Sequence, residues 1–118
     1  MKFNEWYPNG PMVAPGAISM TKVKNLLKKG KGYSTEKFSN IRVNGQLRGS
    51  SGFVRKEGSD RIVYVDTEYV TSLGRNDDRI LVRYAKSAND YCGGTNFYCS
   101  FDKLLQTLET MFADKNLW

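Results

Sequence analysis

A regular spacing of apolar residues near the C-terminus limits the folds open to this chain more than any other pattern in it. Between residues 101 and 112 these residues recur three or four positions apart, as Phe101, Leu104, Leu105, Leu108, Met111 and Phe112. This spacing places them on one face of an α-helix. Ser100 is the expected N-cap, and Asp102 suits the positive end of the helix dipole. Because so wide an apolar face must be buried, we expect the helix to pack on another layer of the chain.

The expected second layer is an antiparallel sheet. Extended runs at residues 38–43, 46–56, 61–67 and 79–86 predict its strands. Asn44-Gly45, between the first two runs, predicts a two-residue hairpin turn because both positions tolerate positive φ. Gly49-Ser50-Ser51-Gly52 predicts either a bulge or a second turn inside the second run. We expect three to four strands, with a turn at residues 57–60 and loops at residues 71–78 and 87–100.

The N-terminal part divides into an arm and a helix. All three prolines lie within residues 1–17, which predicts an extended arm. Residues 18–29 show helical spacing, with Ser19 or Thr21 as the N-cap and Gly30 ending the helix in the left-handed conformation. A length of 118 residues suits a single domain, residues 1–118. We therefore predict an α+β fold: the arm, then a body at residues 18–118 in which a short basic N-terminal helix and a C-terminal amphipathic helix flank the sheet.

The charge is divided unevenly along the chain. Eighteen Lys and Arg against twelve Asp and Glu give a net charge of +6. Residues 1–56 hold 11 basic and 2 acidic residues, a net +9, whereas residues 57–118 hold 7 basic and 10 acidic residues, a net −3. Such asymmetry favours a polyanionic partner for one face of the protein. The alternative is that folding pairs the two halves on the surface.

The residues offer little for catalysis. The chain has no histidine, which excludes histidine-dependent triads, histidine-ligated metals and imidazole proton shuttles. Asp66 and Glu68 share a strand face and suggest a cation site with Asp77 and Asp78, but strand ends often carry solvated carboxylates. We therefore expect a binding protein with no catalytic residue, no metal and no cofactor.

The cysteines give no strong indication of chemistry either. Cys92 and Cys99 are six residues apart and lack the spacing of a zinc site. We expect two reduced thiols, with a disulfide as the alternative. Activation of Cys92 as a nucleophile by Lys86 or Arg83 would need a specific electropositive pocket.

Basic residues are the best candidates for a binding site. The segment KVKNLLKKGKGY holds five lysines and no acidic residue, and arginines follow along the first hairpin. Lysines contact phosphates without reading bases, whereas arginines can make bidentate contacts. The glycine-rich stretch 49–52 can also form an anion-binding nest of backbone amides, or simply a tight turn. The predicted contact residues for nucleic acid or a partner are Lys22, Lys24, Lys28, Lys29, Lys31, Arg42, Arg48 and Arg55.

Several stretches resemble a small domain from phages and conjugative elements of Gram-positive bacteria. They are residues 42–53 (RVNGQLRGSSGF), 62–68 (IVYVDTE), 83–87 (RYAKS) and 90–96 (DYCGGTN). The domain occurs alone or attached to large polyvalent proteins, and the resemblance covers residues 40–112. It implies an accessory role at the boundary between host and mobile element, a setting that includes anti-CRISPR inhibitors. It implies no catalytic motif.

Together these observations predict a non-enzymatic anti-defence protein of the anti-CRISPR type, which binds a host nuclease or its nucleoprotein complex and blocks it. The alternative is a basic accessory protein of the mobile element that binds DNA or RNA on its own. A salt-dependent affinity for bare nucleic acid would distinguish the second from the first. No run of about 18–20 apolar residues and no signal-peptide core is present, so the host cytosol is the expected location and no membrane contact is expected.

Overall fold

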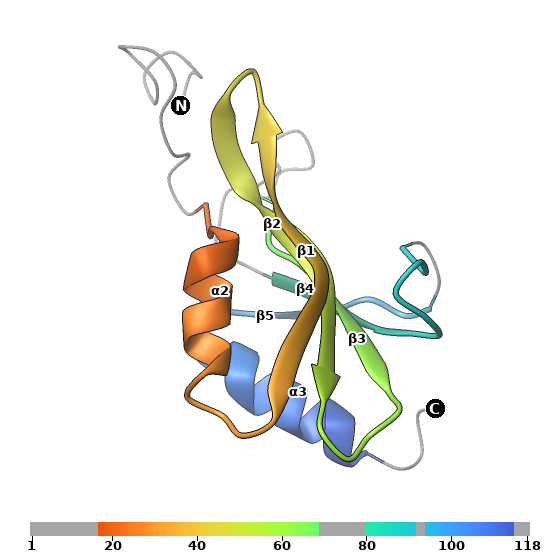
Figure 1. The fold of residues 1–118 in the computed structure, drawn as a ribbon. Coiled ribbons are helices and arrows are strands. Elements are labelled where there is room, and N and C mark those ends of the chain that lie inside the picture. Colours follow the sequence, from red (N-terminus) through yellow and green to blue (C-terminus); the bar gives the residue numbers. More distant parts are fainter. Residues whose placement is uncertain (1–16, 69–79, 92–93, 115–118) are drawn as a thin grey trace.

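The computed structural model describes residues 17–68, 80–91 and 94–114 of the chain (Figure 1). The α+β prediction is confirmed in these residues, which form an antiparallel sheet and two α-helices. The elements are α2 (Met20–Leu27), β1 (Tyr33–Val43), β2 (Gln46–Lys56), β3 (Ile62–Asp66), β4 (Ile80–Ala85), β5 (Phe97–Cys99), the 3-10 helix η1 (Phe101–Lys103) and α3 (Leu104–Ala113).

The five described strands lie side by side in chain order, from β1 to β5. β3 is therefore the central strand of the five. The expectation of three to four strands is wrong, because β5 lies inside residues 87–100, which were expected to form a loop. Three residues are too few to show an alternating pattern. β5 is a strand only through its pairing with β4, where Phe97 lies opposite Val82 and Cys99 opposite Ile80.

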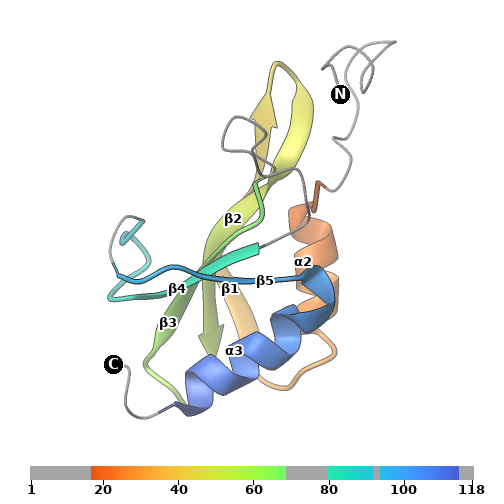
Figure 2. The same ribbon diagram turned by 180° about the vertical axis from the view of Figure 1, so that it is seen from behind.

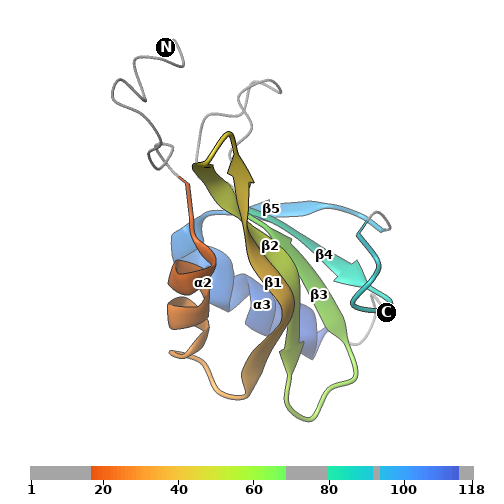
Figure 3. The same cartoon turned by 45° about the horizontal axis from the view of Figure 1, so that its top comes forward.

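Both α-helices pack on the same face of the sheet (Figures 1 and 3). The main core lies between them and the sheet, and α3 crosses the strands when the fold is seen from behind (Figure 2). Burying this apolar surface supplies the main driving force for folding. The side chains of this core, each at most 8% exposed, are Ile18, Val23, Leu27, Val54, Val63, Val65, Ile80, Val82, Leu104, Leu108, Met111 and Phe112.

A second, smaller core lies on the other face of the sheet. Phe53 and Tyr64 form its centre, with ring centroids 5.3 Å apart. The segment after β4 covers them, since the ring of Tyr91 packs edge-on to Phe53 at 5.0 Å. Arg83 is only 6% exposed, and its guanidinium lies 4.6 Å from the centre of the Tyr64 ring. Because both faces of the sheet are covered, β3 is apolar at consecutive positions rather than at alternate ones.

The hairpin formed by β1 and β2 extends beyond the other strands (Figure 1). Asn44 and Gly45 have φ angles of 53° and 79°, so the predicted two-residue turn is confirmed. β2 continues without a second turn, and the register shifts where Ile41 pairs with Gly49 and Arg42 with Leu47. A bulge is therefore present in place of a second turn, but its extra residue is Arg48, directly before the stretch 49–52. A second irregularity lies on β1 at Lys37, which has a φ of 56°.

The structure confirms some of the predicted helix ends and corrects others. Ser19 caps α2 as predicted, and its hydroxyl accepts a hydrogen bond of 3.2 Å from the Lys22 amide. Gly30 does not take the predicted left-handed conformation, because α2 closes through a tight turn in which the Gly30 amide donates to Leu27 at 3.1 Å. At the other helix Ser100 occupies the N-cap position of η1 without a side-chain capping bond, and α3 follows directly.

Some predictions fall on residues that the structure does not describe. Residues 1–16 of the expected arm, the expected loop at 71–78, Asp77, Asp78 and Cys92 lie outside the described residues. Within the described residues, no helix has the length and apolar character needed to cross a membrane.

Candidate nucleic-acid interface

A buried polar cluster fixes the start of α2 against the sheet. The backbone oxygen of Ile18 accepts hydrogen bonds from the hydroxyls of Ser50 on β2 and Thr67 after β3, at 2.9 and 3.0 Å. The Met20 amide donates to the Asn40 side chain on β1 at 2.8 Å. Three parts of the sheet thus hold the first turn of the helix. Since side chains such as Ser50 are fully buried, these bonds also avoid the cost of unsatisfied polar groups.

This anchoring turns the lysines of α2 toward solvent. Val23 and Leu27 enter the core, whereas Lys22, Lys28, Lys29 and the following Lys31 are exposed and Lys24 is half-buried. The chain has no acidic residue between Glu5 and Glu36. None of the five lysines forms an ion pair with a described carboxylate.

The structure adds a sixth cation that the sequence analysis missed. Lys56, at the end of β2, lies opposite Tyr33 at the start of β1, and its ammonium is 5.2 Å from the centre of the Tyr33 ring. Gly30 packs on the same ring, because a Cβ atom there would lie 2.6 Å from it. Lys56 therefore lies beside the loop that carries Lys29 and Lys31. We name the following six residues the lysine surface: Lys22, Lys24, Lys28, Lys29, Lys31 and Lys56.

Two acidic residues border the lysine surface. The first is Glu57, which follows Lys56 in the sequence. Its amide donates a 2.7 Å hydrogen bond to the Gly32 oxygen, which places Glu57 beside the loop after α2. Burial, and to a smaller degree the charge of Glu109 on α3, raises the pKa of Tyr33 to about 12. Tyr33 is therefore a neutral apolar support for the Lys56 side chain at physiological pH.

The lysine surface adjoins a shallow cleft of about 450 Å³. Its walls come from the start of β1 and from the turn between β2 and β3. The cleft holds one further cation, Arg55, whose Nε donates to Glu36 at 2.6 Å. Because both side chains are 41% exposed, this pair is partly screened by water, but it reduces the net charge that Arg55 offers a ligand. The residues that line the cleft are Gly32, Tyr33, Ser34, Arg55, Lys56, Glu57, Gly58 and Ser59.

The other two predicted arginines lie at the far end of the hairpin. Arg42 pairs with Leu47 next to the Asn44-Gly45 turn, whereas Arg55 pairs with Ser34 near the opposite end of β1. Eight residues of strand separate Arg42 from Ser34, which is roughly 26 Å at about 3.3 Å per residue. Arg48 lies in the bulge beside Arg42, and its buried Nε has no hydrogen-bond partner among the described residues. The eight predicted contact residues therefore do not form one continuous patch.

The candidate sites for chemistry are engaged in internal contacts. The two oxygens of Asp66 accept hydrogen bonds from the Tyr64 hydroxyl at 3.3 Å and from the Glu68 amide at 2.8 Å. No group of three potential metal ligands occurs among the described residues. Burial raises the pKa of the Cys99 thiol, which disfavours the reactive thiolate.

The glycine-rich stretch on β2 offers no open anion nest. The Ser50 amide donates to the Thr67 hydroxyl at 2.8 Å. A Cβ atom at Gly49 would lie 2.5 Å from the Thr67 oxygen, and one at Gly52 would lie 2.4 Å from the Phe38 Cα. These glycines are required by close backbone packing.

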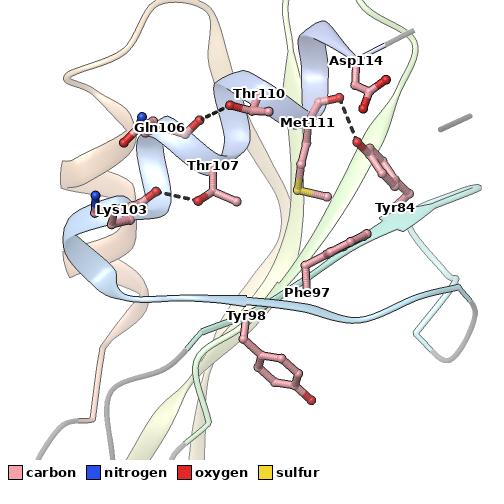
Figure 4. A pocket seen from close by; sticks show the side chains of 9 residues that line it. All are labelled: Tyr84, Phe97, Tyr98, Lys103, Gln106, Thr107, Thr110, Met111 and Asp114. Atoms are coloured by element: carbon pink, nitrogen blue, oxygen red, sulfur yellow. Dashed lines mark hydrogen bonds between the residues drawn. The ribbon is translucent and has the colours of Figure 1, made fainter. Parts of the chain in front are cut away.

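A second depression, of about 460 Å³, lies between α3 and the edge strand β5 (Figure 4). Tyr84 and Phe97 meet edge to face at 6.3 Å on its floor. The hydroxyls of Thr107 and Thr110 donate to backbone oxygens one helical turn earlier, at 2.8 and 3.1 Å. Its lining is therefore mainly apolar, and it includes no pair of carboxylates or thiols that would serve catalysis.

Comparisons with protein-family models, with curated proteins and with solved structures find no match to this chain. The resemblance to a domain of mobile elements therefore stays a prediction, and the function has to be inferred from the arrangement of the residues.

Proposed function

We propose that this protein acts by binding a polyanion through the lysine surface, and that its biological target is the nucleic acid within a host nuclease complex. The observation that carries the proposal is the set of six lysines with no ion pair to a described carboxylate, on α2, on the loop after it and on the adjoining end of β2. Lysine ammonium groups are point charges that neutralise phosphates without reading base sequence. Recognition of nucleic acid by its charge is the interaction that such a surface favours.

The anti-defence role comes from the resemblance to small domains of phages and conjugative elements. A protein of that setting that covers guide RNA or target DNA would block a CRISPR nuclease without chemistry of its own. The net charge of +6 argues against mimicry of DNA, which needs an acidic surface, and supports contact with the nucleic-acid component.

A second candidate function is binding of free DNA or RNA as an accessory protein of the mobile element. The same lysines support it, because contacts to phosphates alone bind nucleic acid with little sequence preference. The two functions differ in what the protein captures. The first predicts capture of a nucleoprotein complex, and the second predicts capture of bare nucleic acid.

An affinity pull-down from a host lysate that contains the nuclease complex separates them. We expect the protein to retain the nuclease, and we expect the double variant Lys28→Glu/Lys29→Glu to lose it. The matched control is Arg42→Glu/Lys86→Glu, which changes the net charge equally at exposed positions that are not part of the lysine surface. The control should retain the nuclease, and purified nuclease should be inhibited by the wild-type protein and by the control only.

A parallel pull-down from a lysate treated with nuclease shows whether the captured partner is protein or nucleic acid. Capture of nucleic acid alone, with no host protein, would support the accessory role and contradict the anti-defence role. Equal capture by the two double variants would contradict both, because neither function would then use the lysine surface.

A further inference from the structure

The lysines of α2 and its closing turn lie along two separate flanks of the helix. Lys24 and Lys28 are four positions apart, which places them one above the other on one flank. Lys22 and Lys29 are seven positions apart, or about two turns, and share the other flank. The ammonium of Lys22 lies 4.9 Å from the centre of the Phe101 ring, so this second flank faces η1. A row of cations therefore borders the exposed face of α2 on each side.

The strip between the two rows is polar and uncharged. Thr21 and Asn25 are four positions apart, both are exposed, and they lie on the side of the helix opposite the core residues Val23 and Leu27. Neither Thr21 nor Asn25 forms a side-chain hydrogen bond with a described residue. α2 lies at the margin of the fold in each of the three ribbon views (Figures 1, 2 and 3). A large ligand can therefore approach this strip along the length of the helix.

This arrangement matches the major groove of B-form DNA. The groove is about 12 Å wide and admits an α-helix, whose diameter with side chains is about 10–12 Å. A helix in this groove has a phosphate backbone on each side and base edges in front of it. The two rows of lysines face the two backbones, and the amide of Asn25 lies between them. An amide both donates and accepts hydrogen bonds, as the base edges in this groove require.

We propose that the polyanion bound by the lysine surface is duplex DNA and that α2 lies in its major groove. The inference rests on the proposed function and narrows its ligand to one class of nucleic acid. Double-stranded RNA is disfavoured, because the major groove of an A-form helix is deep and too narrow for side chains to read. Within a host nuclease complex, α2 would therefore contact the DNA duplex rather than the guide RNA.

Single-stranded nucleic acid is disfavoured for a different reason. Proteins that bind single strands stack the bases on exposed aromatic side chains. The exposed aromatic side chains among the described residues are Tyr91, Phe97 and Tyr98. They lie after β4 and on β5, and none of them belongs to α2 or to the loop after it. The exposed face of α2 offers charges and hydrogen bonds, which suit a duplex.

Fluorescence anisotropy with the full chain tests the choice of ligand. The probes are a short DNA duplex, the RNA duplex of the same sequence and one of the two DNA strands, all measured at the same salt concentration. We expect the DNA duplex to bind about tenfold more tightly than either of the others. Equal or tighter binding of the RNA duplex or of the single strand would overturn the proposal.

The same titrations distinguish this failure from a failure of the proposed function. If the RNA duplex or the single strand binds best and Lys28→Glu/Lys29→Glu abolishes that binding, the lysine surface still binds a polyanion and only the major-groove contact is wrong. If none of the three probes binds, both inferences are wrong.

A neutral substitution tests whether α2 enters the groove. Asn25→Ala removes the polar group between the two rows without changing the net charge, and alanine favours a helix more than asparagine does. We expect the affinity for the DNA duplex to fall by about tenfold. The slope against salt should not change, because the phosphate contacts remain. The matched control is Gln106→Ala, which removes an exposed amide from α3 beside β5. Equal affinities of Asn25→Ala and the wild type would overturn the proposal.

Methylation interference identifies the groove that is occupied. Guanine N7 lies in the major groove and adenine N3 in the minor groove, so a methyl group on either atom obstructs one groove only. We expect DNA methylated at guanine N7 to be depleted from the bound fraction and DNA methylated at adenine N3 to be retained. Depletion of DNA methylated at adenine N3, or retention of both, would contradict a helix in the major groove.

Discussion

Gly49 and Gly52 show how single residues set the position of the lysine helix. Both lie where another backbone approaches β2, at Thr67 and at Phe38 respectively. The approach of Thr67 brings its hydroxyl within reach of Ser50 and of the Ile18 oxygen, which holds α2. The sequence marks these glycines as unusual but not their cause, because a bulge, a turn and a tight contact all favour glycine. Only the register of β2 with β1 and with β3 distinguishes these explanations.

Replacing Gly49 by alanine should destabilise the protein by roughly 1–3 kcal/mol, through the contact with the Thr67 oxygen and a φ of 151° that alanine rarely adopts. Chemical denaturation monitored by circular dichroism measures the change. The exposed Ser39→Ala is the control and should stay within about 0.5 kcal/mol of the wild type. An unchanged midpoint for Gly49→Ala would contradict the close packing.

Two tyrosines make stability fall at alkaline pH. The pKa values of Tyr33 and Tyr64 are both raised to about 12, mainly by burial and in part by Glu109 and Asp66 respectively. The folded state therefore holds two protons that the unfolded state releases near pH 10. Their contribution is complete below pH 10 and is lost as the pH rises from 10 to 12.

Denaturant unfolding at a series of pH values from 9 to 12 should show this loss, and Tyr64→Phe should flatten the dependence. The tyrosinate absorbance of the folded protein should show a late-ionising fraction. Complete ionisation of all tyrosines near pH 10 in the folded state would disprove the shift.

At the scale of elements, the β1–β2 hairpin decides which cations meet. The turn at Asn44-Gly45 alone places Tyr33 opposite Lys56, because the two irregularities lie on different strands and cancel. The position of Lys56 follows from this turn only if β1 extends back to Tyr33, whereas the sequence pattern predicts that the first strand begins at residue 38. β5, by contrast, has no pattern of its own. Long periodic elements are predictable, while strands formed by tertiary pairing are not.

The Ser19 cap is expected to control the order of the lysine helix. α2 has only eight residues, and a helix that short is stable only with caps and tertiary contacts. Ser19→Ala removes the bond to the Lys22 amide and should cost about 0.5–2 kcal/mol. In Ser19→Ala, hydrogen exchange of the backbone amides should become faster in α2 than it is in the wild type, whereas exchange in α3 should not change.

Ser19→Ala should also bind polyanions more weakly than the wild type does, although its net charge is unchanged. Ser19→Asn is the matched variant, because asparagine is an equally good cap. It should behave as the wild type does. Unaltered exchange of the α2 amides in Ser19→Ala would show that the cap is dispensable.

For the whole molecule, the asymmetry of charge along the chain becomes an asymmetry in space. Most of the basic excess predicted for residues 1–56 lies on α2 and the adjoining end of β2, while Arg42 and Arg48 lie at the far end of the hairpin. The charge distribution along the sequence predicts a basic face. It cannot show that Arg42 and Arg48 lie apart from the lysines, because their separation depends on the length and direction of β1. The alternative that the two halves neutralise each other holds for none of the six lysines among the described residues, and the ion pair of Arg55 with Glu36 joins two residues of the same basic half.

The salt dependence of nucleic-acid binding tests the role of the lysine surface most directly. For duplex DNA the logarithm of affinity falls with the logarithm of salt concentration by about 0.9 for each phosphate that is neutralised. Fluorescence anisotropy should give a smaller slope for Lys28→Gln/Lys29→Gln, by about 0.9 per lysine, and an unchanged slope for Arg42→Gln/Lys86→Gln. Equal slopes for the wild type and the lysine variant, or an equal loss in the control, would contradict a binding site on the lysine surface.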